Sequence, residues 1–198
     1  EQAALDARLL AAAQELDAPV NVILGGVLHG AAHGAPPSLR EARRRTAEGF
    51  AALARRAGAL GVRLAVEPIH PAAIGTRSCI NQLDQALALI GDDPRCGLTL
   101  DLFHSWWDPA LERVVAGHPD RLFLVQICGL DILADGGPPR RADLATGPAD
   151  LALLLRDLDA ARYRGPLEYE VFHDAMGRPD PDALLDRAVR DFLSLRGA

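Results

Sequence analysis

Four side chains with oxygen donor atoms stand at or near the ends of separate apolar runs: Glu67, Asp101, Gln126 and Glu170. A buried carboxylate is costly unless it is paired or metal-bound, so four such positions on successive runs indicate a shared cation. Three carboxylates and one neutral amide would leave about −1 net charge around a divalent ion, and all the donors are hard oxygens. This donor set favours Mn²⁺ or Mg²⁺, with Zn²⁺ or Co²⁺ as the alternatives.

Other polar and aromatic side chains lie close to these positions in the chain. His70 follows the first of the four by three residues, where it could contact a substrate. The flat face of Trp106 suits the apolar face of a sugar ring, although packing against a helix explains it equally well. His29 and His33 could line the mouth of a site, but an ordinary loop explains them better. Glu168 is interpreted as a helix-layer or surface residue.

The elements that must position these groups alternate regularly along the chain. Strands are predicted at residues 20–27, 62–66, 97–100, 122–127 and 167–172. Helices are predicted at residues 5–16, 38–60, 82–90, 109–117, 150–163 and 181–195, the second with Ser38 as its N-cap. Residues 131–148 are rich in Gly, Pro and Asp and are predicted to form a loop long enough to be functional. Alternating strands and helices with nearly continuous apolar strands predict a parallel sheet covered on both faces.

Five strands are compatible with an open doubly wound sheet or with part of a closed β/α barrel. The oxygen donors decide between the two folds. In a barrel, the carboxyl ends of neighbouring strands converge on one bowl, whereas in an open sheet the donors would lie in a row. We therefore predict an α/β protein of the (β/α)8 TIM-barrel type with about five parallel strands present.

Composition excludes several classes of function. The 198 residues carry a net charge of −6, which argues against a nucleic-acid partner. All 21 basic residues are Arg, so a Lys Schiff base, a pyridoxal phosphate site and a P-loop lysine are absent from this sequence. The three cysteines are widely spaced and form no C-x-x-C motif, which predicts a reducing, cytoplasmic setting. No apolar run is long enough to predict a membrane span.

Three segments resemble the sugar phosphate isomerase/epimerase superfamily of xylose-isomerase-like, AP-endonuclease-2-type TIM barrels. They are LAVEPIHP at 64–71, LTLDLFHSWWDP at 98–109 and YRGPLEYEVF at 163–172. The resemblance covers essentially the whole chain. It implies one xylose-isomerase-like TIM-barrel domain over residues 1–198 that is incomplete at its N-terminal side and lacks its first three β/α units. The missing units are expected to be encoded elsewhere in the native gene.

The same resemblance implies which residues would bind a metal. The ligand positions of the superfamily fall on Glu67, Asp101, Gln126 and Glu170, and the two glutamates would also be the catalytic acid and base. Gln126 departs from the histidine that is usual at the third position, so an oxygen would replace an imidazole nitrogen. Gly129 departs from an aspartate that commonly follows that strand, which puts the metal affinity in doubt because a supporting carboxylate is missing.

Substrate contacts are implied in the same way. His104, three residues after Asp101, corresponds to a histidine that contacts a substrate oxygen, with a solvated loop histidine as the alternative. Arg141 corresponds to an arginine that faces the substrate, although the neighbouring Arg140 leaves the register open. With His70 and Trp106, these residues form the predicted substrate-binding set.

The implied activity is isomerisation or epimerisation of a sugar or cyclitol, by carboxylate proton transfer through a metal-stabilised enediolate. A lyase of the inosose-dehydratase type uses similar groups and remains an alternative, as does a non-catalytic sugar-binding relic. An endonuclease-IV-like hydrolase needs more metals and more histidine ligands than six scattered histidines offer. The expected partner is therefore a small molecule, with no nucleic acid and no membrane, and a homo-oligomer is left open.

Overall fold

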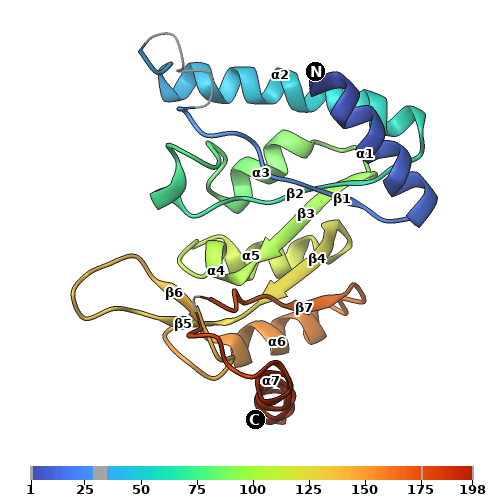
Figure 1. The fold of residues 1–198 in the computed structure, drawn as a ribbon. Helices are drawn as coiled ribbons and strands as arrows, with labels where there is room; N and C mark the ends of the chain where they lie inside the picture. The colour runs from blue at the N-terminus through green and yellow to red at the C-terminus, as the bar shows by residue number, and fades with distance from the viewer. Residues whose placement is uncertain (1, 29–34, 175, 198) are drawn as a thin grey trace. The chain divides into compact units, whose positions relative to one another are not determined.

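The predicted strands form a parallel sheet in the computed structural model, which describes residues 2–28, 35–174 and 176–197 (Figure 1). Its five strands follow the order β1-β2-β3-β4-β7. They are β1 (Val20–Val22), β2 (Leu64–Val66), β3 (Cys96–Asp101), β4 (Leu122–Ile127) and β7 (Leu167–Tyr169). Strands β5 (Gly129–Asp131) and β6 (Arg140–Ala142) form a separate two-stranded sheet. The parallel sheet confirms the predicted α/β class.

Helices connect successive strands, as the alternating pattern predicts. They are α1 (Gln2–Leu16), α2 (Leu39–Ala59), α3 (Leu83–Ile90), α4 (Leu102–Ser105), α5 (Leu111–Gly117), α6 (Leu151–Ala160) and α7 (Pro181–Arg196), with the 3-10 helices η2 (Pro71–Ala73) and η3 (Pro119–Arg121). None of the helices in the described part of the chain combines the length and the apolar character needed to cross a bilayer. His29 and His33 lie outside the described residues.

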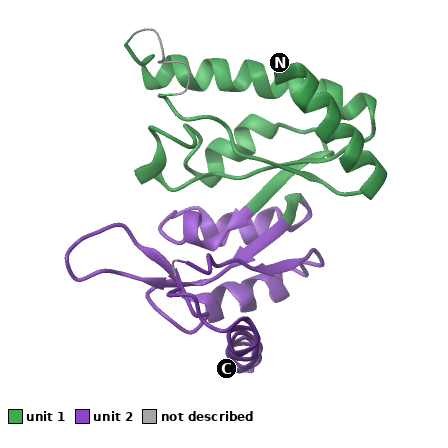
Figure 2. Ribbon diagram, in the orientation of Figure 1, with its two compact units in different colours: residues 1–99, 121–123 green, residues 100–120, 124–198 purple. Residues whose placement is uncertain are grey.

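The chain divides into two compact units (Figure 2). Unit 1 comprises residues 1–99 and 121–123 and contains the parallel pairs β1–β2 and β2–β3. All three residues of β2 are buried, because a parallel strand covered on both faces is apolar throughout. Helix α2 begins where predicted, since the Ser38 side chain accepts a hydrogen bond from the Glu41 backbone N–H at 3.2 Å.

Unit 2 comprises residues 100–120 and 124–198. Its strands β4 and β7 are parallel, with Gln126 paired to Glu168 in the register. The antiparallel strands β5 and β6 place Leu130 opposite Arg141. Unit 2 therefore contains most of the predicted site residues, on β4, on β6, at the end of β3 and just after β7.

The structure corrects several predicted boundaries. Residues 131–148 are not a plain loop, because β6 lies inside them and pairs with β5. The first strand ends at Val22 instead of residue 27, since Val27 and Leu28 donate their backbone N–H groups to the carbonyls of Ile74 and Gly75. The last strand ends at Tyr169 instead of residue 172. Short pairings of this kind leave no periodic signal in the sequence.

Candidate active site

Asp101 is placed by the junction between β3 and α4. The strand is buried along its whole length, and its last residue is also the N-cap of the short helix that follows. The Asp101 Oδ1 atom accepts a hydrogen bond from the Phe103 N–H at 2.9 Å, and the side chain is fully buried. One turn later, His104 Nε2 lies 3.7 Å from Asp101 Oδ2. The sequence thus places a carboxylate and an imidazole side by side.

Arg141 joins Asp101 to Glu170. Its guanidinium donates to both carboxylate oxygens of Asp101, at 3.2 and 2.5 Å, and lies 3.1 Å from Glu170 Oε2. It also donates to the Glu170 backbone carbonyl at 3.3 Å. Burial lowers the pKa of Arg141, but pairing with Asp101 outweighs burial and the pKa is raised above its ordinary value. The permanently charged guanidinium of Arg141 therefore holds two carboxylates from separate parts of unit 2.

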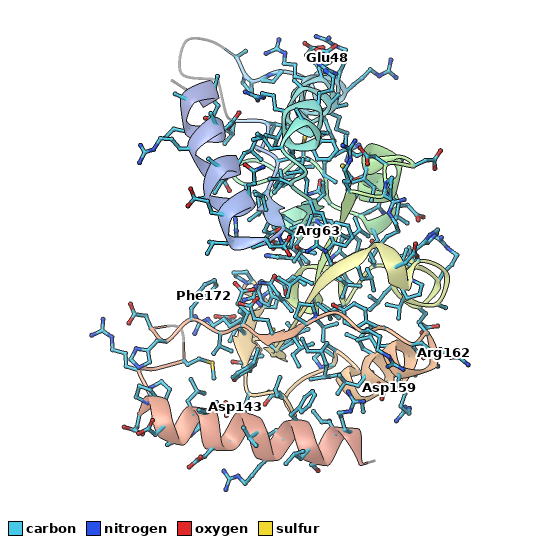
Figure 3. All side chains as sticks on the ribbon, turned by 90° about the vertical axis from the view of Figure 1, so that its right-hand side faces the viewer. Glu48, Arg63, Asp143, Asp159, Arg162 and Phe172 are labelled. Atoms are coloured by element: carbon cyan, nitrogen blue, oxygen red, sulfur yellow. The ribbon has the colours of Figure 1, made fainter. Side chains whose placement is uncertain are left out.

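Apolar and weakly polar groups surround this ion pair. The Arg141 guanidinium lies over the rings of Phe103 and Phe172, at 4.7 and 5.4 Å from their centres (Phe172 is labelled in Figure 3). The Cys128 Sγ atom lies 3.5 Å from the same guanidinium. Burial raises the pKa of the Cys128 thiol to about 11, so the thiol is neutral near pH 7. Charge in the cluster therefore resides on the guanidinium and the carboxylates.

Two glycines explain how the β5–β6 hairpin delivers Arg141. A Cβ atom at Gly129 would overlap the Asp143 carbonyl oxygen, and one at Gly147 would overlap the Leu130 carbonyl oxygen. Gly147 also has a φ angle of +88°, which other residues rarely adopt. The backbone of residues 129–130 approaches that of residues 143–147 too closely for a side chain at either glycine. Gly129 is thus required by the hairpin, which gives a physical reason for its departure from the aspartate implied by the resemblance.

Gln126 and Glu168 form a neighbouring polar pair on β4 and β7. The Gln126 Nε2 group donates to Glu168 Oε2 at 3.4 Å. The Gln126 Oε1 atom is buried and accepts no hydrogen bond from the residues that the structure describes. Glu168 is exposed, as expected of a surface residue, but its contact with Gln126 was not predicted. A buried acceptor without a donor is uncommon and indicates a site for an electropositive group.

Glu67 and His70 belong to unit 1. Glu67 directly follows β2, is buried, and accepts a hydrogen bond from Asn21 Nδ2 at 2.6 Å. Asn21 was missed by the sequence reasoning, although a polar residue in the middle of an apolar run was a usable signal. His70 begins η2, where its Nδ1 atom accepts from the Ala72 N–H at 3.2 Å, and burial lowers the pKa of its ring.

Trp106 lies elsewhere in unit 2. It ends helix α4 and lines a cavity of about 170 Å³ together with residues of α4, α5 and α6. Its indole Nε1 is buried and makes no hydrogen bond among the described residues. The structure therefore brings together Asp101, His104, Arg141 and Glu170, whereas Trp106 packs among helices. A sugar-stacking role for Trp106 stays a prediction.

The donor set of these residues fits a divalent metal. Asp101 and His104 belong to a group of buried His, Asp and Glu side chains that could hold an ion. Gln126 has a buried carbonyl oxygen that no described residue satisfies, which is the kind of ligand a hard cation takes. Carboxylate, amide and imidazole donors also match the ligand types of Mn²⁺ and Zn²⁺ sites.

Comparisons with known proteins relate the chain to a family and to solved structures. The family model of the xylose isomerase-like TIM barrel matches residues 4–194. A 3-dehydroshikimate dehydratase of Pseudomonas putida is 32% identical over 131 residues, covering 62% of this chain, and the chain spans only 20% of that relative's length.

Solved structures show the same fold. A protein of Sinorhizobium meliloti is 31% identical, with a TM-score of 0.80 over 95% of this chain and 68% of its own. An L-ribulose 3-epimerase is 24% identical, with a TM-score of 0.68 over 96% of this chain and 65% of its own, a level of identity that shows the fold alone. These comparisons confirm the predicted fold and superfamily, and the chain belongs to the xylose isomerase-like TIM barrel family.

Proposed function

We propose that this protein is a divalent-metal-dependent sugar or cyclitol isomerase or epimerase, which moves a proton at the carbon beside a carbonyl group. The observation that carries the proposal is the cluster in which the buried Arg141 holds the buried carboxylate of Asp101 and the half-buried carboxylate of Glu170. Carboxylates held in a fixed geometry are the groups that such proton transfer requires. The activity for which the L-ribulose 3-epimerase, a neighbour in fold, is named supports the same class of chemistry.

The proposed metal ligands are Glu67, Asp101, Gln126 and Glu170. Glu67 supports the set because it is a buried carboxylate that directly follows β2, and Gln126 because its buried Oε1 has no donor among the described residues. Mn²⁺ or Mg²⁺ suits these oxygens best, and Zn²⁺ or Co²⁺ would be tolerated. A bound divalent ion would act as a Lewis acid on the oxygens of the substrate.

The protein's own groups would perform the proton transfer. Glu170 removes a proton from the substrate carbon and Glu67 returns one, or the reverse. Arg141 fixes the Glu170 carboxylate through its contact with Oε2 and keeps it oriented. His104, held against Asp101, would donate a hydrogen bond to a substrate oxygen, and His70 is a further proposed substrate contact.

Dehydration is a second candidate outcome of the same chemistry. The curated relative named 3-dehydroshikimate dehydratase is 32% identical to this chain, a closer match in sequence than the epimerase. Loss of a hydroxyl group as water, after a proton has left the neighbouring carbon, would replace return of the proton to that carbon. The substrate, and not the carboxylate pair, would then decide the product.

Both reactions begin with removal of a proton from a substrate carbon, and activity assays in D₂O test this step. We expect the protein with Mn²⁺ in D₂O to incorporate deuterium into a ketose, or to release water from 3-dehydroshikimate, and we expect Glu170→Gln to lower either rate by at least about 10²-fold. Circular dichroism would check that the variant is folded. Proton NMR of the substrate separates epimerisation from dehydration. Full activity of the variant would refute the assigned role of Glu170.

A further inference from the structure

We propose that Glu168 is a positioning residue that determines which end of the Gln126 amide faces the metal. This inference rests on the proposed function and deepens it. The two residues are direct partners in the parallel register of β4 and β7, which lie side by side in Figure 1. Partners in a sheet project from the same face, and their side chains meet at 3.4 Å, from Gln126 Nε2 to Glu168 Oε2.

The chemistry of the pair allows only one orientation of the amide. An ionised carboxylate has acceptor atoms only, whereas the amide has a donor end and an acceptor end. Gln126 must therefore turn its NH₂ group toward Glu168, because the reverse orientation would oppose two acceptors. The Oε1 atom is consequently directed away from Glu168.

The fixed orientation gives Gln126 its ligand character. Its Oε1 atom is buried, the side chain is only 7% exposed, and no described residue donates to this oxygen. A buried carbonyl oxygen in this position attracts a cation or a strong donor. In metal sites, a carboxylate that accepts from the far side of a ligand orients that ligand and raises its basicity. Glu168, on the neighbouring strand, accepts a hydrogen bond from Gln126 Nε2 and would orient the Gln126 amide in this way.

Metal titration by calorimetry tests the assignment. For Glu168→Ala we expect Mn²⁺ affinity to fall by about 10-fold, the lower end of the effect of removing such a support. Glu168→Gln keeps an acceptor oxygen and should recover part of the loss. In a Gln126→Ala background, Glu168→Ala should change affinity by less than about twofold, because Glu168 acts through Gln126. Asp159→Asn removes one carboxylate of an exposed ion pair with Arg196 and serves as the charge-matched control (labelled in Figure 3).

Three outcomes would overturn the inference. Unchanged affinity in Glu168→Ala would show that Glu168 has no part in binding. An equal loss with and without Gln126 would show that Glu168 acts directly, by charge or as a ligand. If the unaltered protein binds no Mn²⁺, the proposed metal site fails, and the Nε2 protons of Gln126 in ¹⁵N NMR spectra then decide separately. Their chemical shifts should move in Glu168→Ala, and identical shifts would remove the positioning role.

Discussion

The buried cluster of unit 2 depends on Arg141. Its guanidinium contacts carboxylates from the end of β3 and from the segment after β7, and two aromatic rings cover it. A buried carboxylate is strongly destabilising when its cationic partner is removed, because nothing replaces the lost hydration. The contribution of Arg141 is therefore structural as well as electrostatic. It supplies the positive charge that pairs with these carboxylates where a metal is proposed to bind.

Replacing Arg141 with Met keeps an apolar stem of similar length between the rings but removes the cation. We expect Arg141→Met to lower the free energy of unfolding in metal-free buffer by about 3–5 kcal/mol. Urea unfolding followed by circular dichroism measures the change. The control is Arg187→Met, which breaks a partly exposed ion pair with Asp143 and should cost less than about 1 kcal/mol. Similar small losses in both variants would contradict the role of Arg141.

At the scale of elements, the β5–β6 hairpin and the short helix α4 build the cluster. Asp101 is the N-cap of helix α4, one turn of which brings His104 back beside it, while β6 carries Arg141. The hairpin packs so closely against residues 143–147 that glycine is needed at Gly129 and Gly147. Backbone proximity, and not side-chain packing alone, therefore determines where the guanidinium lies.

Substitution of Gly147 tests this dependence on the backbone. Gly147→Ala places an alanine in a left-handed backbone conformation and makes its Cβ overlap the Leu130 carbonyl oxygen. We expect it to lower the free energy of unfolding by about 2–5 kcal/mol. Gly136→Ala is the matched control, since its φ is +77° but a Cβ there meets no atom within 4 Å. The control should cost about 1–2 kcal/mol. Equal losses in denaturant unfolding would show that the close approach at Gly147 is unimportant.

At the scale of the whole molecule, the proposed metal site links ion binding to folding, because its ligands are spread along the chain from Glu67 to Glu170. A cation that binds only the folded chain stabilises it by mass action. Metal binding is therefore proposed to be coupled to the folding of the whole chain.

Added metal should accordingly raise the stability of the protein. At a free Mn²⁺ concentration about 100 times Kd, we expect the free energy of unfolding to rise by about 2.7 kcal/mol. It should fall back to its metal-free value when a chelator removes the ion. Asp101→Asn preserves the ability to cap α4 and should lose the increment, whereas Asp159→Asn should retain it. Thermal unfolding with and without Mn²⁺ measures both. An increment that survives in Asp101→Asn would place the ion elsewhere.

Much of the fold and part of the site could be predicted from the sequence. Continuous apolar runs identified the parallel strands, and acidic residues at the ends of those runs identified Glu67 and Asp101 as candidates. The Ser38 cap and the family resemblance were also confirmed. These features are local, because hydrophobic period, capping and motif spacing involve residues close together in the chain.

The tertiary structure alone decided the contacts between distant residues. Arg141 and Asp101 are 40 residues apart, and Gln126 and Glu168 are 42 apart, so no local pattern joins either pair. The short hairpin that carries Arg141 was predicted as a loop, because its pairing is set by close backbone packing at Gly129. The residue types were determined by the sequence, but their partners depend on which segments the folded chain brings together.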